Sequence, residues 1–309
     1  MKKLNITLFL LCSCMLNSYA QNSFVYNSIQ AAKHAGEPFN TISVLRPVQQ
    51  SDLQIKEMQE HFFNPKEVYL MQYDKTAAEN LHTSITMLIP LNDSNIALEL
   101  LEVVMDYQIR TSDDKQILMS DKNIRHYHGI VKDDPHSIVA ITFGEEEIIG
   151  LVATDEGNFN LTIAPQLGEH IFYNDKNLKQ KPEFSCATEE HDDYSRTGYS
   201  KDSISGVSLF NKKVVRLYFE TTYDILQTRG SIAAVEIFIA GIHNQAALLY
   251  KNENIAVELS GIMIWTTQYP FATFVGMHDL FSQYQAYRTS FNGDLGQLVT
   301  FRSTGSFFK

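Results

Sequence analysis

The spacing of apolar residues changes once along this chain, and the change limits what it can fold into. From about residue 39 to residue 175, short runs rich in Val, Ile, Leu and Tyr alternate with turn residues, roughly every eight to twelve positions. Strands this short and this closely spaced predict a mostly antiparallel sheet. After residue 213 the order becomes strand, helix, strand, helix, strand, which predicts an α/β layer with parallel strands. The expected fold class is therefore α+β.

Individual elements follow from the same patterns. A helix is expected near residues 52–62, and a long one at 231–252 with Ser231 as its N-cap. The alternation at 255–264 is interrupted at Ser260-Gly261, which predicts a strand with a bulge. The remaining expected elements are a helix at 277–287 and strands at 67–71, 84–89, 97–107, 124–131, 137–143, 148–153, 159–163, 214–219 and 298–301.

The N-terminus has the pattern of a secretory signal peptide at residues 1–20. Two lysines precede an apolar run at 6–15, which is too short to span a bilayer. Small residues then predict cleavage between Ala20 and Gln21. A lipoprotein signal with Cys14 as the acylated residue is the alternative. We expect a secreted, periplasmic or cell-surface protein.

Charge and composition limit the classes of partner that the chain is expected to bind. The chain carries 25 Lys and Arg against 36 Asp and Glu, a net charge of −11, with no basic cluster. That balance argues against nucleic-acid binding. No segment after the signal peptide is predicted to span a membrane, because the best candidate, 232–250, contains Glu236, His243 and Asn244 and is typical of a buried helix.

Sequence motifs for catalysis are sparse. Gly-x-Ser-x-Gly, a phosphate-binding Gly-rich loop and Cys-x-x-Cys are all missing, and so is any His-Glu dipeptide. His126 and His128 would face the same side of a strand and could share a metal, but no third ligand is in view, which favours packed or solvated strand histidines. For His243, two helical turns after Glu236, a hydrogen-bonded core histidine or a partly exposed one is favoured.

Cysteine usage singles out one residue. The chain has three cysteines, and cleavage after Ala20 removes two of them. The one that remains, Cys186, lies in a polar stretch that is expected to be a linker. A lone thiol in an oxidising compartment cannot form an internal disulfide, so Cys186 needs another explanation.

Two separated regions point to one family. The run 127–137, which contains Asp134-Pro135-His136-Ser137 and is followed by Gly150-Leu151-Val152, resembles the propeptide of secreted adamalysin/reprolysin-type metallopeptidases, a metzincin group. Further along, four segments in collinear order are similar to the first half of the catalytic domain of that group. They are 214–223, 244–250, 259–267 and 281–296.

The resemblance implies a domain organisation. After the signal peptide would come a β-rich propeptide-like domain at 21–185, a linker at 186–213, and the N-terminal part of an incomplete metzincin-like α/β catalytic domain at 214–309. A complete member would be a zinc endopeptidase acting on extracellular protein or peptide substrates. In such zymogens a cysteine occupies the fourth position on zinc, which makes Cys186 the candidate ligand of a latent form. Lys212-Lys213 would be a processing site for a trypsin-like enzyme.

One departure from the family is decisive for activity. The family motif H-E-x-x-H-x-x-G-x-x-H supplies three zinc-binding histidines and a general base, and this sequence does not contain it. We therefore expect a chain that is truncated before the zinc motif, has no catalytic residues of its own, cannot bind zinc as a catalytic site, and is inactive. The alternative is a non-enzymatic secreted binding protein or an inhibitory propeptide-like protein.

Overall fold

The computed structural model describes residues 23–113, 118–121, 123–164, 167–180, 214–270 and 277–301. The predicted signal peptide with Ala20 and Gln21, the candidate zinc ligand Cys186, and the dibasic pair Lys212-Lys213 lie outside these residues. Within them the chain forms two sheets and several helices, so the predicted α+β class is confirmed.

The larger sheet has ten strands in the order β1-β4-β5-β8-β9-β10-β11-β12-β3-β2. All its neighbours pair antiparallel except β1 with β4. The strands are β1 (Asn40–Ile42), β2 (Leu45–Pro47), β3 (Tyr69–Tyr73), β4 (Ser84–Pro90), β5 (Asn95–Val103), β8 (Arg125–Val131), β9 (Ile138–Phe143), β10 (Ile148–Thr154), β11 (Gly157–Ala164) and β12 (Glu169–Asn174).

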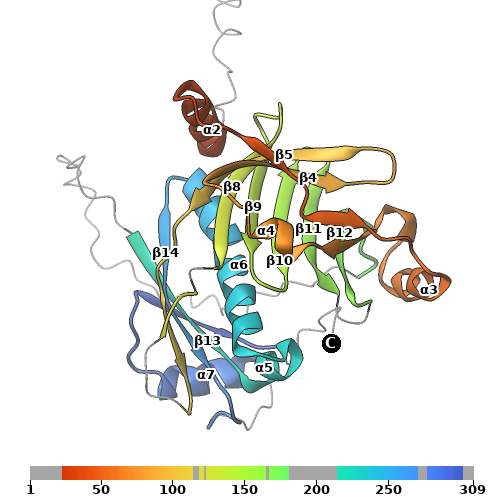
Figure 1. Cartoon of the computed structure of the whole chain (residues 1–309). Coiled ribbons are helices and arrows are strands. Elements are labelled where there is room, and N and C mark those ends of the chain that lie inside the picture. Colours follow the sequence, from red (N-terminus) through yellow and green to blue (C-terminus); the bar gives the residue numbers. More distant parts are fainter. Residues whose placement is uncertain are drawn as a thin grey trace, which may run out of the picture.

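This sheet curls until its two ends meet. β1 and β2 stand at opposite ends of the strand order, yet only Ser43 and Val44 separate them along the chain. β2 accordingly contacts β4, and in Figure 1 strands β4 and β5 run across the view while β8 to β10 run down it. Alternate side chains from the strands fill the inside, including the fully buried Tyr127, Ile141 and Phe172. We call this sheet the barrel.

Helices cover the outside of the barrel. α2 (Phe24–His34) and α3 (Asp52–His61) each begin at a serine cap, and α3 has a full capping box between Ser51 and Gln54. α3 packs Met58 and Phe62 against β3 and β12, and α2 packs Val25 and Ile29 against β8 and β9. The short helix α4 (Lys75–Ala78) and the 3-10 turns η1 (Pro65–Glu67) and η2 (Asp175–Asn177) complete this region.

The second sheet has five strands in the order β15-β13-β14-β6-β7, and we call it the open sheet. β13 (Val214–Thr221) pairs parallel with both β14 (Ala256–Ile264) and β15 (Leu295–Val299), as the sequence predicts. Ser260 is the extra residue of the predicted bulge, since the register moves from Leu259 to Gly261 there. Its hydroxyl donates to the Leu217 carbonyl at 2.8 Å.

Two strands of the open sheet come from the first part of the chain. β6 (Gln108–Thr111) pairs parallel with β14, and β7 (Leu118–Met119) pairs antiparallel with β6. The strand predicted at 97–107 is therefore wrong in its second half. β5 ends at Val103, the chain leaves the barrel through the exposed Val104, and it joins the other sheet at Gln108.

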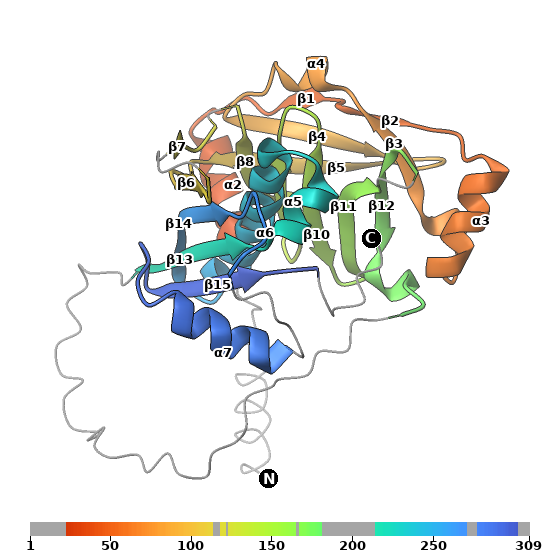
Figure 2. The same cartoon turned by 90° about the horizontal axis from the view of Figure 1, so that it is seen from below.

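The long helix α6 (Ile232–Asn252) lies between the two sheets (Figure 1). One side of it, with Val235 and Ile239, joins the core of the open sheet, while Ile237 and Leu248 pack on the outside of the barrel. Ser231 caps it by accepting from the Ala234 N–H at 3.1 Å, as predicted. α5 (Tyr223–Arg229) precedes it, and α7 (Met277–Tyr287) lies on the opposite face of the open sheet (Figure 2).

By length and composition, α6 is the one helix among the described residues that could cross a membrane. Its position explains the composition, because a helix covered by a sheet on each side has little polar surface. Three polar side chains within it, those of Glu236, His243 and Asn244, are buried against protein. This agrees with the prediction that the chain has no transmembrane segment after its signal peptide.

Candidate functional site

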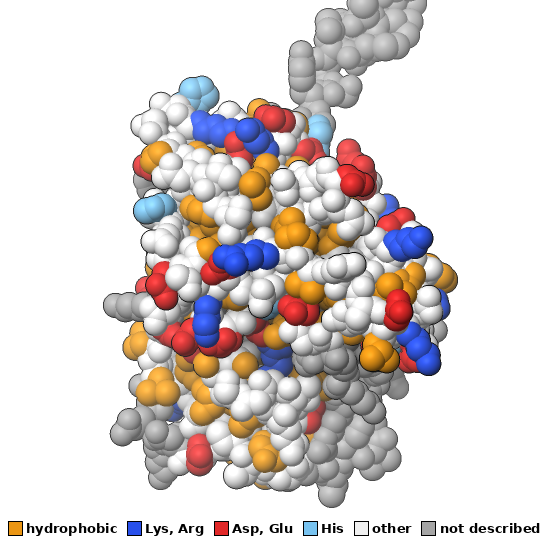
Figure 3. Space-filling model, turned by 45° about the vertical axis from the view of Figure 1, so that its right-hand side comes forward, with side chains coloured by type: hydrophobic (Ala, Val, Ile, Leu, Met, Phe, Trp, Pro, Cys, Tyr) orange, Lys and Arg blue, Asp and Glu red, His pale blue; other side chains and the backbone are white. Residues whose placement is uncertain are grey.

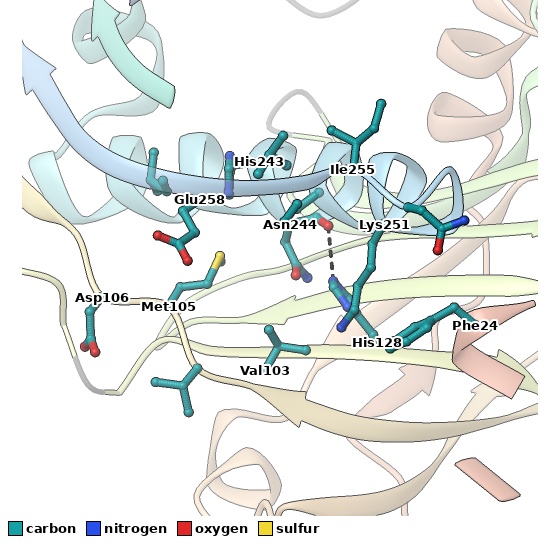
Figure 4. A pocket seen from close by; sticks show the side chains of 16 residues that line it. Phe24, Val103, Met105, Asp106, His128, His243, Asn244, Lys251, Ile255 and Glu258 are labelled. Atoms are coloured by element: carbon teal, nitrogen blue, oxygen red, sulfur yellow. Dashed lines mark hydrogen bonds between the residues drawn. The ribbon is translucent and has the colours of Figure 1, made fainter. Parts of the chain in front are cut away.

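A cavity of about 420 Å³ opens where α6, the barrel and the open sheet meet (Figure 4). This volume falls in the range of about 300–1,000 Å³ that is typical of small-molecule sites. The lining comes from α2, the end of β5 and the residues after it, β8, the second half of α6, and the start of β14. It consists of Phe24, Val103, Val104, Met105, Asp106, His128, His243, Asn244, Ala247, Lys251, Asn254, Ile255, Ala256, Val257, Glu258 and Leu259.

Local sequence explains why polar groups reach this place. On β8, Tyr127 points into the barrel, so His126 and His128 on either side of it point outward, beneath α6. Both histidines are buried, which makes them packed strand histidines, as favoured from the sequence. In α6, Asn244 lies on the side that faces β8 and β9 and bonds to both strands, while the ring of the adjacent His243 packs edge-on against Phe219 of β13, with centroids 6.1 Å apart.

Asn244 holds α6 to the barrel with one end of its amide. Its Nδ2 donates to the Ile141 carbonyl at 3.1 Å and to the Thr142 Oγ1 at 3.2 Å, with the Tyr127 carbonyl at 3.5 Å. Because three oxygens surround the nitrogen, the orientation of the amide is fixed. The Oδ1 is therefore left as an acceptor, and it has no hydrogen-bond partner among the described residues.

His128 is fixed in the same way. Its Nε2 lies 3.3 Å from the Asn244 carbonyl oxygen, which can only accept, so Nε2 carries the hydrogen. In the neutral ring the Nδ1 is then a bare acceptor, and within the described structure it is buried without a partner. The Nδ1 of His243 is also buried and unpartnered there. Three residues of the lining thus each carry one side-chain atom that is buried from solvent and has no hydrogen-bond partner among the described residues.

The buried histidines are uncharged at neutral pH. Burial, together with the nearby Lys251 ammonium, lowers the pKa of His128 to about 4. Burial alone lowers the pKa of His243 to about 4. His126, which lies 3.0 Å from the Thr142 hydroxyl, has a pKa of about 3, because of burial first and then the other two histidines. The two histidines that line the cavity, His128 and His243, are therefore neutral.

The charges of the cavity lie apart from one another. Lys251 extends from the last turn of α6 toward His128, with its Nζ 4.5 Å from the centre of the Phe24 ring (Figure 4). Asp106 and Glu258 lie at the other end, both exposed, beside Met105 (Figure 4). The walls between them are largely aliphatic. The cavity therefore has a mixed polar and aliphatic lining, with a cation at one end and two carboxylates at the other.

The residues of the cavity do not fit a catalytic zinc ion. His126, His128 and His243 lie near one another, but no group of three His, Cys, Asp or Glu in the described part of the chain is placed to hold a metal. Glu236, which the sequence places on the same helix face as His243, has other partners: the Tyr107 hydroxyl and the Asp121 N–H, each at 2.9 Å. Cys186, the zinc ligand suggested by the resemblance, lies outside the described residues.

Sequence reasoning found part of this site. His128, His243 and Asn244 were singled out as polar residues of a strand and a helix, but nothing in their spacing predicts that they border one cavity. Met105 and Asp106 gave no signal, because only the crossing from β5 to β6 brings them to the cavity, and Lys251 gave none because a lysine in the last turn of a helix is usually a solvated residue. That crossing was itself missed.

Figure 3 shows how side chains of different types are distributed on one face of the molecule. There the Lys and Arg side chains are interspersed with Asp and Glu, and hydrophobic side chains are scattered among them. Comparison with protein-family models and with curated protein sequences gave no match. The fold and the cavity therefore define the chain as a two-sheet α+β protein with a ligand-sized cavity at the junction of its sheets.

Proposed function

We propose that this chain is the precursor form of a secreted zinc metalloendopeptidase, in which the barrel region is the propeptide. Export rests on the signal-peptide pattern of residues 1–20, and the activity of the complete enzyme on the metzincin resemblance. Substrates would be internal peptide bonds of extracellular proteins. The sequence given contains no His-Glu dipeptide, so these residues alone would not cut them.

One observation supports the proposal that the barrel region is a propeptide. β6, from the first part of the chain, adds to the β14 edge of the open sheet, and the barrel covers the outer side of α6. A propeptide that assists folding must complete the structure of its partner, and an added edge strand does so with main-chain hydrogen bonds. The parallel β14-β13-β15 layer with helices on both faces is the kind of structure that the resemblance implies for 214–309.

The test begins with the DNA that follows codon 309. We expect an H-E-x-x-H sequence there, in frame or after a single frameshift. The extended protein, nicked at Lys212-Lys213 by trypsin, should then cleave casein, and a chelator should abolish the cleavage. The 309-residue chain itself should show no chelator-sensitive cleavage. If the extended DNA contains no such motif, or the 309-residue chain cleaves casein with zinc, the proposal is wrong.

The second candidate is a non-enzymatic secreted binding protein. The cavity favours it, since its volume of about 420 Å³ suits a small molecule and all its lining residues are among those described. This candidate predicts a stop codon, no downstream zinc motif, and a stable full-length protein in the medium.

A further inference from the structure

We propose that a groove on the α7 face of the open sheet binds a small molecule that carries an oxyanion, either a carboxylate or a phosphate. Arg110, Tyr218 and Arg288 donate hydrogen bonds to the oxyanion. This site lies away from the cavity beneath α6, goes beyond the proposed function and does not depend on it.

The groove lies beside α7 on the same face of the sheet. α7 packs Leu280 and Tyr284 against Trp265 and Leu298, and it lies beneath β15 in Figure 2. Over β14 and β6 a groove of about 700 Å³ is left, and residues 288–292, which follow α7, line it as well. Its volume is in the range of about 300–1,000 Å³ that is typical of small-molecule sites.

Strand register brings the donors to this face. Arg110 of β6 is the cross-strand partner of Met263 in β14, and Tyr218 of β13 is the partner of Gly261. Cross-strand partners point to the same face of a sheet, and so do residues two apart on one strand. Met263 packs in the cluster under α7, so Arg110 and Tyr218 point to that side too, and both line the groove.

The Tyr218 hydroxyl is a free donor. A Cβ on Gly261 would lie 3.3 Å from the Tyr218 Cδ2, so the glycine leaves room for the ring to lie across β14. In the described structure the hydroxyl has no hydrogen-bond partner, and it is not closed off from solvent. Burial and then Glu220 raise the pKa of Tyr218, while Arg288 and Arg110 oppose the rise, so both guanidinium groups lie near this hydroxyl.

The groove carries one positive charge that the described residues do not balance. Arg110 is exposed and has no ion pair or hydrogen bond with any of them. Arg288 is paired, because its Nε and Nη2 donate to the buried Glu220 carboxylate at 2.7 and 3.1 Å, but its Nη1 remains as a donor. Among the described residues that line the groove there is no Asp or Glu, although the chain has 36 of them.

These groups select the charge of the ligand. An oxyanion accepts from guanidinium and hydroxyl donors in charge-assisted hydrogen bonds, which are about twice as strong as neutral ones. A cationic ligand would be repelled by Arg110, and a neutral amide would gain no charge attraction from it. Carboxylate and phosphate both match the planar donor set of arginine, so the experiment includes one probe of each kind.

The test compares three probes with the same aromatic ring: benzoate, phenyl phosphate and benzamide, each added to the full chain at pH 7 and low ionic strength. Binding is followed by amide chemical shifts in β6 and β14. We expect the better anion to bind with a Kd of about 1 mM, and benzamide to bind about tenfold more weakly or worse. Tighter binding of benzoate assigns the site to carboxylates, and tighter binding of phenyl phosphate assigns it to phosphates.

Arg110→Gln tests the free charge. It should weaken binding of the better anion about tenfold or more, and leave Tm unchanged because the side chain is exposed and unpaired in the described structure. The matched control is Arg46→Gln, the same change at an exposed arginine of β2 in the barrel, which should leave Kd unchanged.

Tyr218→Phe tests the hydroxyl. It keeps the ring that stacks on Phe291, with centres 5.5 Å apart, and removes only the donor. Binding of the better anion should weaken about fivefold. Failure of both anions to bind, binding of benzamide as tight as that of the anions, or unchanged anion binding in either variant overturns the proposal.

Discussion

The barrel and the open sheet obtain their cores in different ways. The barrel is built mostly from antiparallel neighbours that follow one another along the chain, such as β8 to β12, and all its inner side chains come from residues 42–172. The open sheet joins strands that are far apart in sequence, and its core includes Tyr107 and Ile109 from the first region. One core is local and closed, and the other is assembled from both parts of the chain.

The difference teaches that the two sheets are not independent units. The outside of the barrel needs α6 to cover Ile130, Ala140 and Ile149, and the open sheet needs β6 to cover the edge of β14. α6 is the element that both share. We therefore expect a substitution that destabilises one sheet to destabilise the other sheet as well.

The largest effect is expected from Phe172→Ala inside the barrel. Phe172 is fully buried and stacks on Phe159, with ring centres 5.3 Å apart. Removing it should lower the free energy of unfolding by about 4 kcal/mol. Trp265 is the single tryptophan of the chain and lies in the core on the α7 face of the open sheet, so its fluorescence follows the second sheet during urea unfolding.

If the sheets are coupled, the Trp265 transition moves to lower urea together with the circular dichroism of the barrel. Phe63→Ala is the control, since that side chain is 69% exposed and should cost less than about 1 kcal/mol. A Trp265 transition that stays in place while the barrel unfolds would show two independent units.

Next in size is the buried ion pair between Arg229 and Glu147, which joins the end of α5 to the turn between β9 and β10. Burial raises the pKa of Glu147, and Arg229 opposes that rise. Arg229→Met leaves the carboxylate buried alone and should cost about 3 kcal/mol. Adding Glu147→Gln should recover part of that loss.

The pair of Arg46 and Asp74, whose arginine is exposed, supplies the control for this pair, because Arg46→Met should cost less than about 1 kcal/mol. Equal costs for the two arginines, measured by urea unfolding, would mean that the buried pair does not link α5 to the barrel.

Sequence patterns predicted the elements whose partners are local or whose amphipathic pattern is long. α3, α6, α7 and the strands of the β8–β11 meander lie close to their expected positions. The serine cap of α6 and the bulge at Ser260 were also correct, because both depend on chemistry within a few residues. The expected strand at 298–301 lies slightly earlier, at Leu295–Val299.

What the sequence could not predict depends on long-range pairing. The apolar run at 97–107 has the same alternation on both sides of Val104, so nothing local shows that the chain changes sheets there. The placement of β6 and the cavity follow from that crossing, whereas the closure of the barrel depends on the long-range pairing of β1 with β4 and of β2 with β3. One signal was present: Glu236, His243 and Asn244 in an otherwise apolar helix indicated buried polar contacts without naming their partners.

A smaller effect is expected where α6 touches β10. A Cβ on Gly241 would lie 3.3 Å from two carbon atoms of Ile149, which is a tight contact. Gly241→Ala should change stability by less than about 1 kcal/mol, because the gain in helix propensity offsets the crowding. Gly241→Leu should cost about 2 kcal/mol by pushing α6 away from the barrel. Equal stability of the two variants in urea would contradict this close approach.

The smallest effect tests the pairing of β6 with α6 through pH. Burial raises the pKa of Glu236, although the N–H of Asp121 and the hydroxyl of Tyr107 partly oppose the rise. The folded chain therefore holds this proton more tightly than the unfolded chain does. That contribution to stability is complete below the ordinary carboxyl pKa of about 4.5 and is lost as pH rises through the folded value.

Glu236→Gln removes the titration while keeping an oxygen that accepts from Tyr107 and Asp121. The wild-type protein should therefore lose stability relative to Glu236→Gln as pH rises from 4.5 to 7. Urea unfolding at a series of pH values measures the difference, in which other titrating groups cancel. A difference that stays constant, or that grows in favour of the wild type, would mean that Glu236 is not buried against the residues that flank β6. The hydrogen bonds of Glu236 with Tyr107 and Asp121 would then not attach this part of the chain to α6.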